Sequence, residues 1–270
     1  MTHNPAPAWL AVDVGNSRVK AGLFVSAHET GRALPECLVH FNEPLDVGLP
    51  WIELTTVGEG LDFSGVVVGS NQQGVDRVTA EWSQQFDRPL AVIRSSRDFP
   101  VPVDVESPER VGLDRLLNAV AVNARRNADR AVIVVDCGTA TTVDLVTSDG
   151  TFRGGAILPG FALGAKALHH YTEVLPLISI EQVVDVDPVS GGHAALGRNT
   201  QAAIMSGVFW GQVGAVRELI QRLAKPLDSP FDIVLTGGGS RLLVTHIDDA
   251  IHAPFLPLQG LIVAAEAMEV

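Results

Sequence analysis

The chain has 270 residues, of which 46% are hydrophobic and 19% are charged, as is typical of a well-packed globular protein and not of a disordered one. That length accommodates one large domain or two smaller ones. The net charge of −12 argues against binding to nucleic acid or to an anionic membrane, because both need clustered lysine and arginine.

Short apolar runs of strand length alternate with helical patterns along the chain. The strand-like runs are Trp9–Val12, Val19–Val25, Gly65–Gly69, Leu90–Ile93, Ala131–Val135, Thr142–Val146 and Asp232–Leu235. Helical periodicity, with apolar residues three and four positions apart, is clearest in Asp114–Arg126, Gln201–Leu223 and Leu258–Met268. The alternation predicts an α/β fold.

One pattern occurs twice. The segment WLAVDVGNSRVKAGLF begins at Trp9 and VIVVDCGTATTVDLVT begins at Val132, and each reads as an apolar strand, Asp-x-Gly, a short polar turn and a second strand. The two aspartates, Asp13 and Asp136, are separated by nearly half of the chain. We therefore expect two related domains, 1–125 and 126–270, each opening with a β-hairpin.

The residues of the first hairpin suit a phosphate group as well as an ordinary turn. Glycine turns let the backbone approach a ligand, and successive backbone N–H groups form a concavity that binds anions. Between Asp13 and Lys20, these amides, the Ser17 hydroxyl and the Lys20 ammonium could surround triphosphate oxygens. Because Asp13 would repel phosphate, we expect it to hold a hydrated Mg²⁺ ion.

The second hairpin offers Asp136, Gly138, Thr139 and Thr142 for the opposite side of a nucleotide. Two glycine-rich segments would complete such a site, Thr236–Ser240 after a strand and Gly154–Gly160. Taken alone, the first reads as a flexible loop and the second as a Gly/Pro turn. Together with two hairpins, they favour a nucleotide-binding site.

A carboxylate also stands at the predicted start of a helix, in the run Val111-Gly-Leu-Asp-Arg115. The helix dipole favours Asp114 there whether or not it takes part in chemistry, so helix capping is one interpretation. The other makes Asp114 the base that accepts a proton from a substrate hydroxyl, while Arg115 binds an anionic group.

These motifs resemble those of the type III pantothenate kinases, in the superfamily of sugar kinases, actin and chaperone ATPases. The resemblance spans nearly the whole chain and rests on Asp13-x-Gly-Asn-Ser-x-x-Lys20, Gly112-x-Asp-Arg115, Asp136-x-Gly-Thr-Ala-x-Thr142, Gly154–Gly160, Gly197-Arg-Asn-Thr200 and Thr236–Gly239. It implies two tandem actin-like (ribonuclease H-like) α/β domains around a nucleotide cleft. It also implies an enzyme that phosphorylates pantothenate with ATP to give 4'-phosphopantothenate, the first step of coenzyme A biosynthesis.

Transferred by motif position, the resemblance implies a set of ligand contacts. ATP would be bound by Asp13, Val14, Gly15, Asn16, Ser17, Arg18, Val19, Lys20 and Thr139. Pantothenate would be bound by Gly112, Leu113, Asp114, Arg115 and Thr200, with Asp114 as the general base. Asp136 would hold a monovalent cation, K⁺ or NH₄⁺, which the family needs beside Mg²⁺. Members of the family are dimers with the substrate pocket near the subunit interface, so a homodimer is expected.

One position departs from the family pattern. Members usually carry a tyrosine three residues before the proline that precedes Gly-x-Asp-Arg, whereas Val105 stands at that spacing before Pro108. The missing phenol removes contact surface and a polar group from the pantothenate pocket. A kinase for another small hydroxylated substrate is therefore an alternative. A non-catalytic regulator of the same fold is a second alternative, which the loss of Asp13, Asp114 or Asp136 would have favoured.

The remaining features concern location and packing. The N-terminus lacks a basic start and an apolar core, and no apolar run is long enough for a membrane span, so we expect a cytoplasmic protein without membrane partners. The two cysteines indicate neither a disulfide framework nor a zinc site. Tyr171 is the only tyrosine, and we expect it to pack within the protein.

Overall fold

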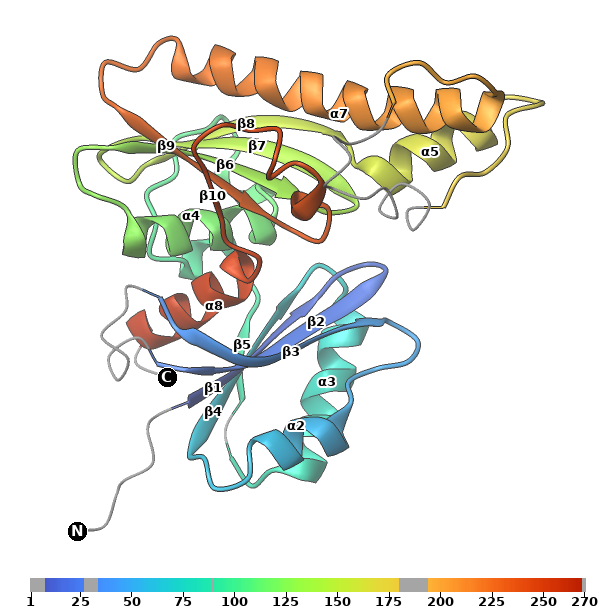
Figure 1. The fold of residues 1–270 in the computed structure, drawn as a ribbon. Coiled ribbons are helices and arrows are strands. Elements are labelled where there is room, and N and C mark those ends of the chain that lie inside the picture. Colours follow the sequence, from blue (N-terminus) through green and yellow to red (C-terminus); the bar gives the residue numbers. More distant parts are fainter. Residues whose placement is uncertain (1–7, 27–33, 89, 180–193, 269–270) are drawn as a thin grey trace. The chain divides into compact units, whose positions relative to one another are not determined.

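A computed structural model of the protein describes residues 8–26, 34–88, 90–179 and 194–268. The chain forms two compact units, Met1–Asn127 with Phe255–Val270 and Ala128–Pro254. Each unit contains one five-stranded sheet (Figure 1).

The first unit has the strand order β3-β2-β1-β4-β5. Its strands are β1 (Ala8–Val14), β2 (Arg18–Val25), β3 (Glu36–Pro44), β4 (Phe63–Gly69) and β5 (Leu90–Ile93). β1 pairs antiparallel with β2, which pairs antiparallel with β3, whereas β1, β4 and β5 are parallel. The predicted hairpin at Asp13–Lys20 is thus confirmed as the β1–β2 hairpin.

Both faces of the first sheet are covered by helices. On one face, Leu10, Val12 and Val14 share a buried cluster with residues of α2 (Trp51–Val57) and α3 (Gln72–Gln85). Helix α8 (Leu256–Ala267) packs against β1 and β4 on the other side of the sheet, and α4 (Leu113–Arg125) packs against α8 (Figure 1). The two helices approach so closely that a Cβ on Gly260 would lie 2.0 Å from the Leu117 carbonyl oxygen.

The contacts of α8 change the expected domain boundary. The second domain was expected to run to residue 270, but Phe255–Val270 belongs to the first unit. The physical reason is that α8 buries an almost wholly apolar sequence against α4 and the first sheet. The break after Asn127 lies close to the expected boundary at residue 125.

The second unit repeats the strand connections of the first. Its order is β10-β9-β6-β7-β8, formed by β6 (Ala131–Cys137), β7 (Ala140–Val146), β8 (Phe152–Pro159), β9 (Phe231–Thr236) and β10 (Ala250–His252). β6, β7 and β8 are successively antiparallel, while β6, β9 and β10 are parallel. The same topology therefore occurs twice, and the prediction of two related α/β halves is confirmed.

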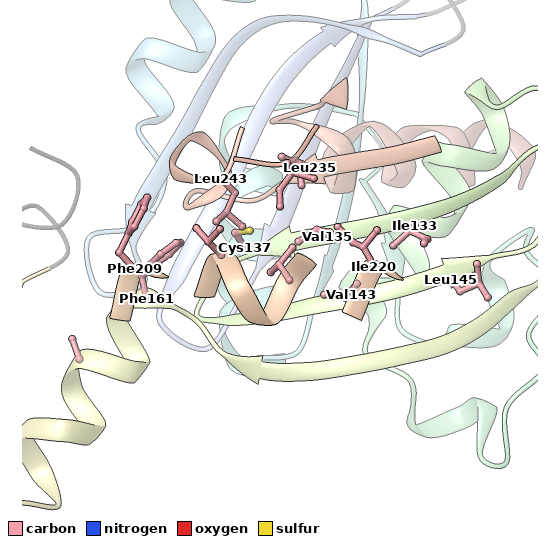
Figure 2. Packing of buried hydrophobic residues seen from close by; sticks show 14 of the residues in the cluster. Ile133, Val135, Cys137, Val143, Leu145, Phe161, Phe209, Ile220, Leu235 and Leu243 are labelled. Carbon is pink, nitrogen blue, oxygen red and sulfur yellow. The ribbon is translucent and has the colours of Figure 1, made fainter. Parts of the chain in front are cut away.

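One face of the second sheet is covered by apolar packing, and Asp136 lies on the other face. Figure 2 shows Ile133, Val135 and Cys137 of β6 in one apolar cluster with Phe209 and Ile220, which belong to α7 (Thr200–Ala224). Helix α5 (Phe161–His170) contacts α7 and β8. Because side chains alternate along a strand, Asp136 lies on the face opposite this cluster.

The predicted runs coincide well with the observed elements. Each strand-like run lies within β1, β2, β4, β5, β6, β7 or β9, and the three helical patterns correspond to α4, α7 and α8. Strands β3, β8 and β10 were not predicted. In the part of the chain that the structure describes, no helix combines the length and apolar character needed to cross a membrane.

Candidate active site

The β1–β2 hairpin places a carboxylate and an ammonium group opposite each other beside an exposed turn. Asp13 pairs with Lys20 in the strand register, and the Lys20 Nζ lies 3.9 Å from the Asp13 Oδ2. The Gly15 N–H donates to the Arg18 carbonyl oxygen at 2.9 Å and closes the turn, in which Asn16, Ser17 and Arg18 are exposed. The ammonium and the exposed turn thus lie on one hairpin, as a phosphate site requires.

Not every side chain of this hairpin is available to a ligand in the same way. The Arg18 guanidinium turns toward β3, where its Nε donates to the Asn42 Oδ1 at 2.7 Å. Val14 and Val19 are buried in the core of the first unit. Their side chains hold the hairpin to the sheet, so only their backbone could meet a ligand.

The β6–β7 hairpin has a tighter turn and a more buried aspartate. Cys137 and Ala140 end the two strands, so Gly138 and Thr139 alone form the turn, which the Gly138 N–H closes by donating to the Ala140 carbonyl oxygen at 3.0 Å. Both turn residues are exposed. Asp136 is 9% exposed and is flanked in register by Thr142 on β7 and Thr236 on β9.

Two glycine-rich segments meet this second hairpin. The Gly160 N–H donates to the Thr139 carbonyl oxygen at 3.1 Å, and the Gly239 N–H donates to the Cys137 carbonyl oxygen at 2.9 Å. Gly237 has a φ of +85°, and a Cβ there would lie 2.4 Å from the Asp136 Oδ1. Only glycine allows the loop this conformation and this approach to the carboxylate.

The interpretation of Gly154–Gly160 as a turn is wrong for most of the segment. Residues up to Pro159 belong to β8, and only Gly160 lies beyond the strand. Gly155 pairs with Asp144 of β7, and a Cβ on Gly155 would lie 2.0 Å from the Val143 carbonyl oxygen. The glycine therefore serves a close approach between strands, a role that a local reading of Gly/Pro content does not reveal.

The surroundings of Asp136 fit a cation. In the described part of the chain, the Oγ1 atoms of Thr142 and Thr236 are buried and make no hydrogen bond. Both lie on strands beside Asp136 and, by the strand register, on its face of the sheet. A buried hydroxyl without a hydrogen-bond partner is costly, and a carboxylate with neighbouring hydroxyl oxygens is a set of ligands that hard cations prefer.

The neighbouring Cys137 is kept in its thiol form. Burial, reinforced by the charge of Asp136, raises the pKa of the Cys137 thiol to about 12.

Asp114 stands in the first turn of α4. Gly112 is the N-cap residue, and the Asp114 Oδ1 accepts a hydrogen bond from the Arg115 N–H at 2.9 Å. The carboxylate is exposed, and a Cβ on Gly112 would lie 2.6 Å from the same Oδ1. Because Gly112 has no side chain, the Asp114 carboxylate has room at this place. Its position agrees both with a role in helix capping and with a role as a base.

A cavity of about 310 Å³ lies beside the segment that leads into α4. It is formed by two short 3₁₀ turns, η1 (Ser96–Asp98) and η2 (Pro108–Arg110), and by the chain between them. Its lining residues are Ser96, Arg97, Phe99, Val101, Val103, Pro108 and Glu109. Val105 is not among them.

Thr200 is the first residue of α7 and is exposed. Asn199 caps the helix by accepting a hydrogen bond from the Ala202 N–H at 2.8 Å. Thr200 lies in the second unit, whereas the other predicted pantothenate contacts, Gly112–Arg115, lie in the first. The predicted ATP contacts are divided in the same way, with Thr139 in the second unit and the first hairpin in the first. Neither unit alone therefore contains all the predicted contacts of either ligand. Among the described residues, no group of three or more His, Cys, Asp or Glu side chains is placed to hold a metal ion.

Three residues near this site were given no individual role from the sequence. Thr236 and Ser240 stand within the predicted loop, and a hydroxyl directly beside a glycine run was the signal available for them. His252 lies on β10 and reaches the loop through the pairing of β10 with β9. No local pattern indicates that proximity.

Comparison with known sequences identifies the family. The profile described as type III pantothenate kinase matches residues 9–222. A type III pantothenate kinase of Thermomicrobium roseum is 33% identical over 267 residues, which cover 96% of this chain and 97% of the relative. That of Paramagnetospirillum magneticum is 38% identical and covers 94% and 95%, whereas that of Ruegeria sp. (strain TM1040) is 41% identical and covers 64% and 63%.

Solved structures support the fold independently. A Campylobacter jejuni protein assigned to the Baf family of transcriptional activators has a TM-score of 0.59 at 19% identity and covers 97% of this chain and 100% of that chain. A Sinorhizobium meliloti protein described as a 2-dehydro-3-deoxygalactonokinase has a TM-score of 0.52 at 17% identity and covers 97% and 98%. At such identity the likeness concerns the actin-like fold alone. The profile match and the full-length relatives go further, and by them the chain belongs to the type III pantothenate kinase family.

Proposed function

We propose that the protein transfers a phosphoryl group from ATP to pantothenate, giving 4'-phosphopantothenate for coenzyme A biosynthesis. The observation that carries the proposal, together with family membership, is the equivalence of the two hairpins. Asp13 and Asp136 are each the sixth residue of the first strand in a repeated sheet topology. Each is followed by a glycine-containing turn with exposed residues, where backbone N–H groups can bind phosphate.

ATP contacts are proposed on both hairpins. In the first, the backbone from Asp13 to Lys20, the Ser17 hydroxyl and the Lys20 ammonium would bind phosphate oxygens, and in the second Thr139 would do so. Asp13 would hold Mg²⁺ through water, a common arrangement for this ion in kinases. Bound Mg²⁺ supplies charge neutralisation at the phosphates. Lys20 adds a fixed positive charge from the protein itself.

Asp136 is the proposed ligand of a monovalent cation, K⁺ or NH₄⁺. The buried and unbonded hydroxyls of Thr142 and Thr236 support this assignment, because they provide oxygen donors beside the carboxylate in the described part of the second unit. Gly237 covers the same carboxylate closely. A cation bound there would connect the glycine-rich loop to the second hairpin.

Asp114 is the proposed base for the pantothenate hydroxyl. Its exposed position at the start of α4 allows a substrate hydroxyl to donate to it, and the proton would pass to one of its carboxylate oxygens as the oxygen attacks phosphorus. Gly112, Leu113, Arg115 and Thr200 are the further proposed pantothenate contacts. Arg115 suits the substrate's carboxylate, because a guanidinium binds such a group in a bidentate manner.

A homodimer is proposed from an exposed apolar surface of the second unit. Tyr171, expected to pack within the chain, is 82% exposed, and Val174 is 84% exposed. Leu163, Leu168 and Leu177 are exposed nearby along α5 and the segment that follows it. A second copy of the chain would bury this surface, and Tyr171→Glu should then shift the mass measured by light scattering toward a monomer. The chain's metabolic role would place it in the cytoplasm.

The proposed base is tested by Asp114→Asn in a coupled assay with saturating Mg·ATP, K⁺ and pantothenate. A positioned base typically contributes about 10²–10⁴-fold to rate, so we expect kcat to fall by that factor. Asp228→Asn, which neutralises an exposed aspartate ahead of β9, serves as the matched control. Full activity of Asp114→Asn would disprove the base assignment.

The same assay separates the alternatives. Turnover of another hydroxylated compound in preference to pantothenate would favour the kinase of different specificity, to which Val105 points. No ATP turnover by the wild-type protein at saturating cation would favour the non-catalytic regulator.

A further inference from the structure

A side chain on β10 is connected to the glycine-rich loop by a short series of hydrogen-bond contacts. Ser240 follows Gly237–Gly239, is fully buried and begins the 3₁₀ turn η4 (Ser240–Leu242). Its Oγ lies 2.6 Å from the Gly237 carbonyl oxygen and 2.9 Å from the His252 Nε2. His252 itself is exposed.

The number of hydrogens determines the direction of both bonds. A carbonyl oxygen can only accept, so the single hydroxyl hydrogen of Ser240 goes to Gly237. The His252 Nε2 must then carry a hydrogen and donate it to the Ser240 Oγ. Burial and the positive charge of Arg241 lower the pKa of His252, which favours a neutral ring. The contact with Ser240 then assigns the single ring hydrogen to Nε2.

His252 is held in place independently of the loop. It pairs with Leu235 in the parallel register of β9 and β10, and the neighbouring Ala253 N–H donates to the Leu235 carbonyl oxygen at 2.8 Å. The far end of the series is Gly237, whose backbone lies against the Asp136 carboxylate. The hydrogen bonds therefore run from a sheet strand to the first glycine of the loop.

We propose that His252 is a positioning residue: through Ser240, it holds Gly237–Gly239 in the conformation that binds the nucleotide beside Asp136. The inference rests on the proposed use of this loop in ATP binding. Without the His252 donor, the Ser240 Oγ loses the hydrogen bond that it accepts, and only its donation to the Gly237 carbonyl is left to hold its rotamer. The loop would sample other conformations, and ATP would have to order it on binding.

The test compares His252→Leu with His252→Gln, which keeps an N–H donor at similar reach. Loss of one hydrogen bond is worth about 1 kcal/mol, so His252→Leu should raise the KM for ATP about fivefold. The KM for pantothenate and the melting temperature should stay near wild type, and His252→Gln should recover most of the ATP affinity. In a Ser240→Ala background, His252→Leu should add nothing, because the connection is already broken.

Hydrogen exchange gives a second measurement that does not depend on activity. In His252→Leu the amide of Gly239, which donates to Cys137, should exchange faster, while that of Gly138 in the β6–β7 turn should be unchanged. A wild-type KM for ATP in His252→Leu would overturn the positioning role, as would equal effects of Leu and Gln, or a parallel loss of both KM values and of thermal stability. If the wild-type enzyme does not turn over ATP, the proposed function fails. The exchange experiment then decides alone, and unchanged exchange at Gly239 overturns the inference.

Discussion

Asp13 in the first unit and Asp136 in the second occupy the same position of a repeated topology, but their neighbours on the adjoining strands differ. Asp13 lies between Lys20 on the antiparallel strand and Val68 on the parallel strand. Asp136 lies between Thr142 and Thr236 at the corresponding places. One hairpin thus combines its carboxylate with a positive charge, and the other combines its carboxylate with uncharged oxygens. The difference suits phosphate and Mg²⁺ in the first case and a monovalent cation in the second.

The loops that follow the parallel strands differ in a related way. Gly69, the last residue of β4, lies so close to β1 that a Cβ would be 2.4 Å from the Val14 carbonyl oxygen, and the Asn71 side chain in the following loop caps α3. After β9, Gly238 is exposed, and a Cβ there would meet nothing within 4 Å. The glycine at the end of β4 serves packing between strands, whereas the loop after β9 leaves backbone open to a ligand.

The largest effect is expected from making the first hairpin resemble the second. Lys20→Thr places the residue type of Thr142 opposite Asp13 and removes a charge that would stabilise the transferring phosphoryl group. Loss of such a contact costs about 10²–10³-fold, which we expect in kcat measured with saturating Mg·ATP. Lys225→Thr, at the exposed end of α7, is the control. Equal rates for the two variants would mean that Lys20 does not bind phosphate.

A smaller effect is expected from adding a methyl group to the exposed glycine-rich loop after β9. Gly238→Ala adds a methyl group where the protein itself leaves space, so the melting temperature should hardly change. If ATP lies against this backbone, the methyl group costs about 1–3 kcal/mol of overpacking in the complex and raises the KM for ATP about fivefold or more. Gly237→Ala is the informative contrast, because its φ of +85° and the nearby Asp136 should make that variant lose thermal stability as well. Unchanged ATP affinity in Gly238→Ala would place the nucleotide elsewhere.

The smallest effect is expected from making the second unit resemble the first at the parallel strand. Thr236→Val installs the residue type of Val68 and removes a buried hydroxyl that has no hydrogen bond in the described structure. The free energy of unfolding should therefore stay equal or rise by about 1 kcal/mol without K⁺. The K⁺ concentration for half-maximal activity should rise about fivefold, since an oxygen donor is lost. A variant that is less stable and equally responsive to K⁺ would contradict the role given to this hydroxyl.

Much of the fold followed from local sequence. Val, Ile and Leu in short runs marked the central strands, because a strand covered on both faces reads as a continuous apolar run. The repeated Asp-x-Gly turn located both hairpins and the two aspartates. Strand β3 escaped because polar residues interrupt its apolar ones and none of its residues is fully buried, and β8 escaped because its glycines suggested a turn.

The sequence by itself determined the residue types at the site: two carboxylates after apolar strands, a lysine seven residues after the first, and glycines where backbone must come close. Only the tertiary structure decided which oxygens flank Asp136, that α8 completes the first unit, and that His252 reaches Ser240. These contacts depend on strand register and helix packing between residues far apart in the chain. Such contacts are selected by the burial of whole faces, which no short stretch of sequence records.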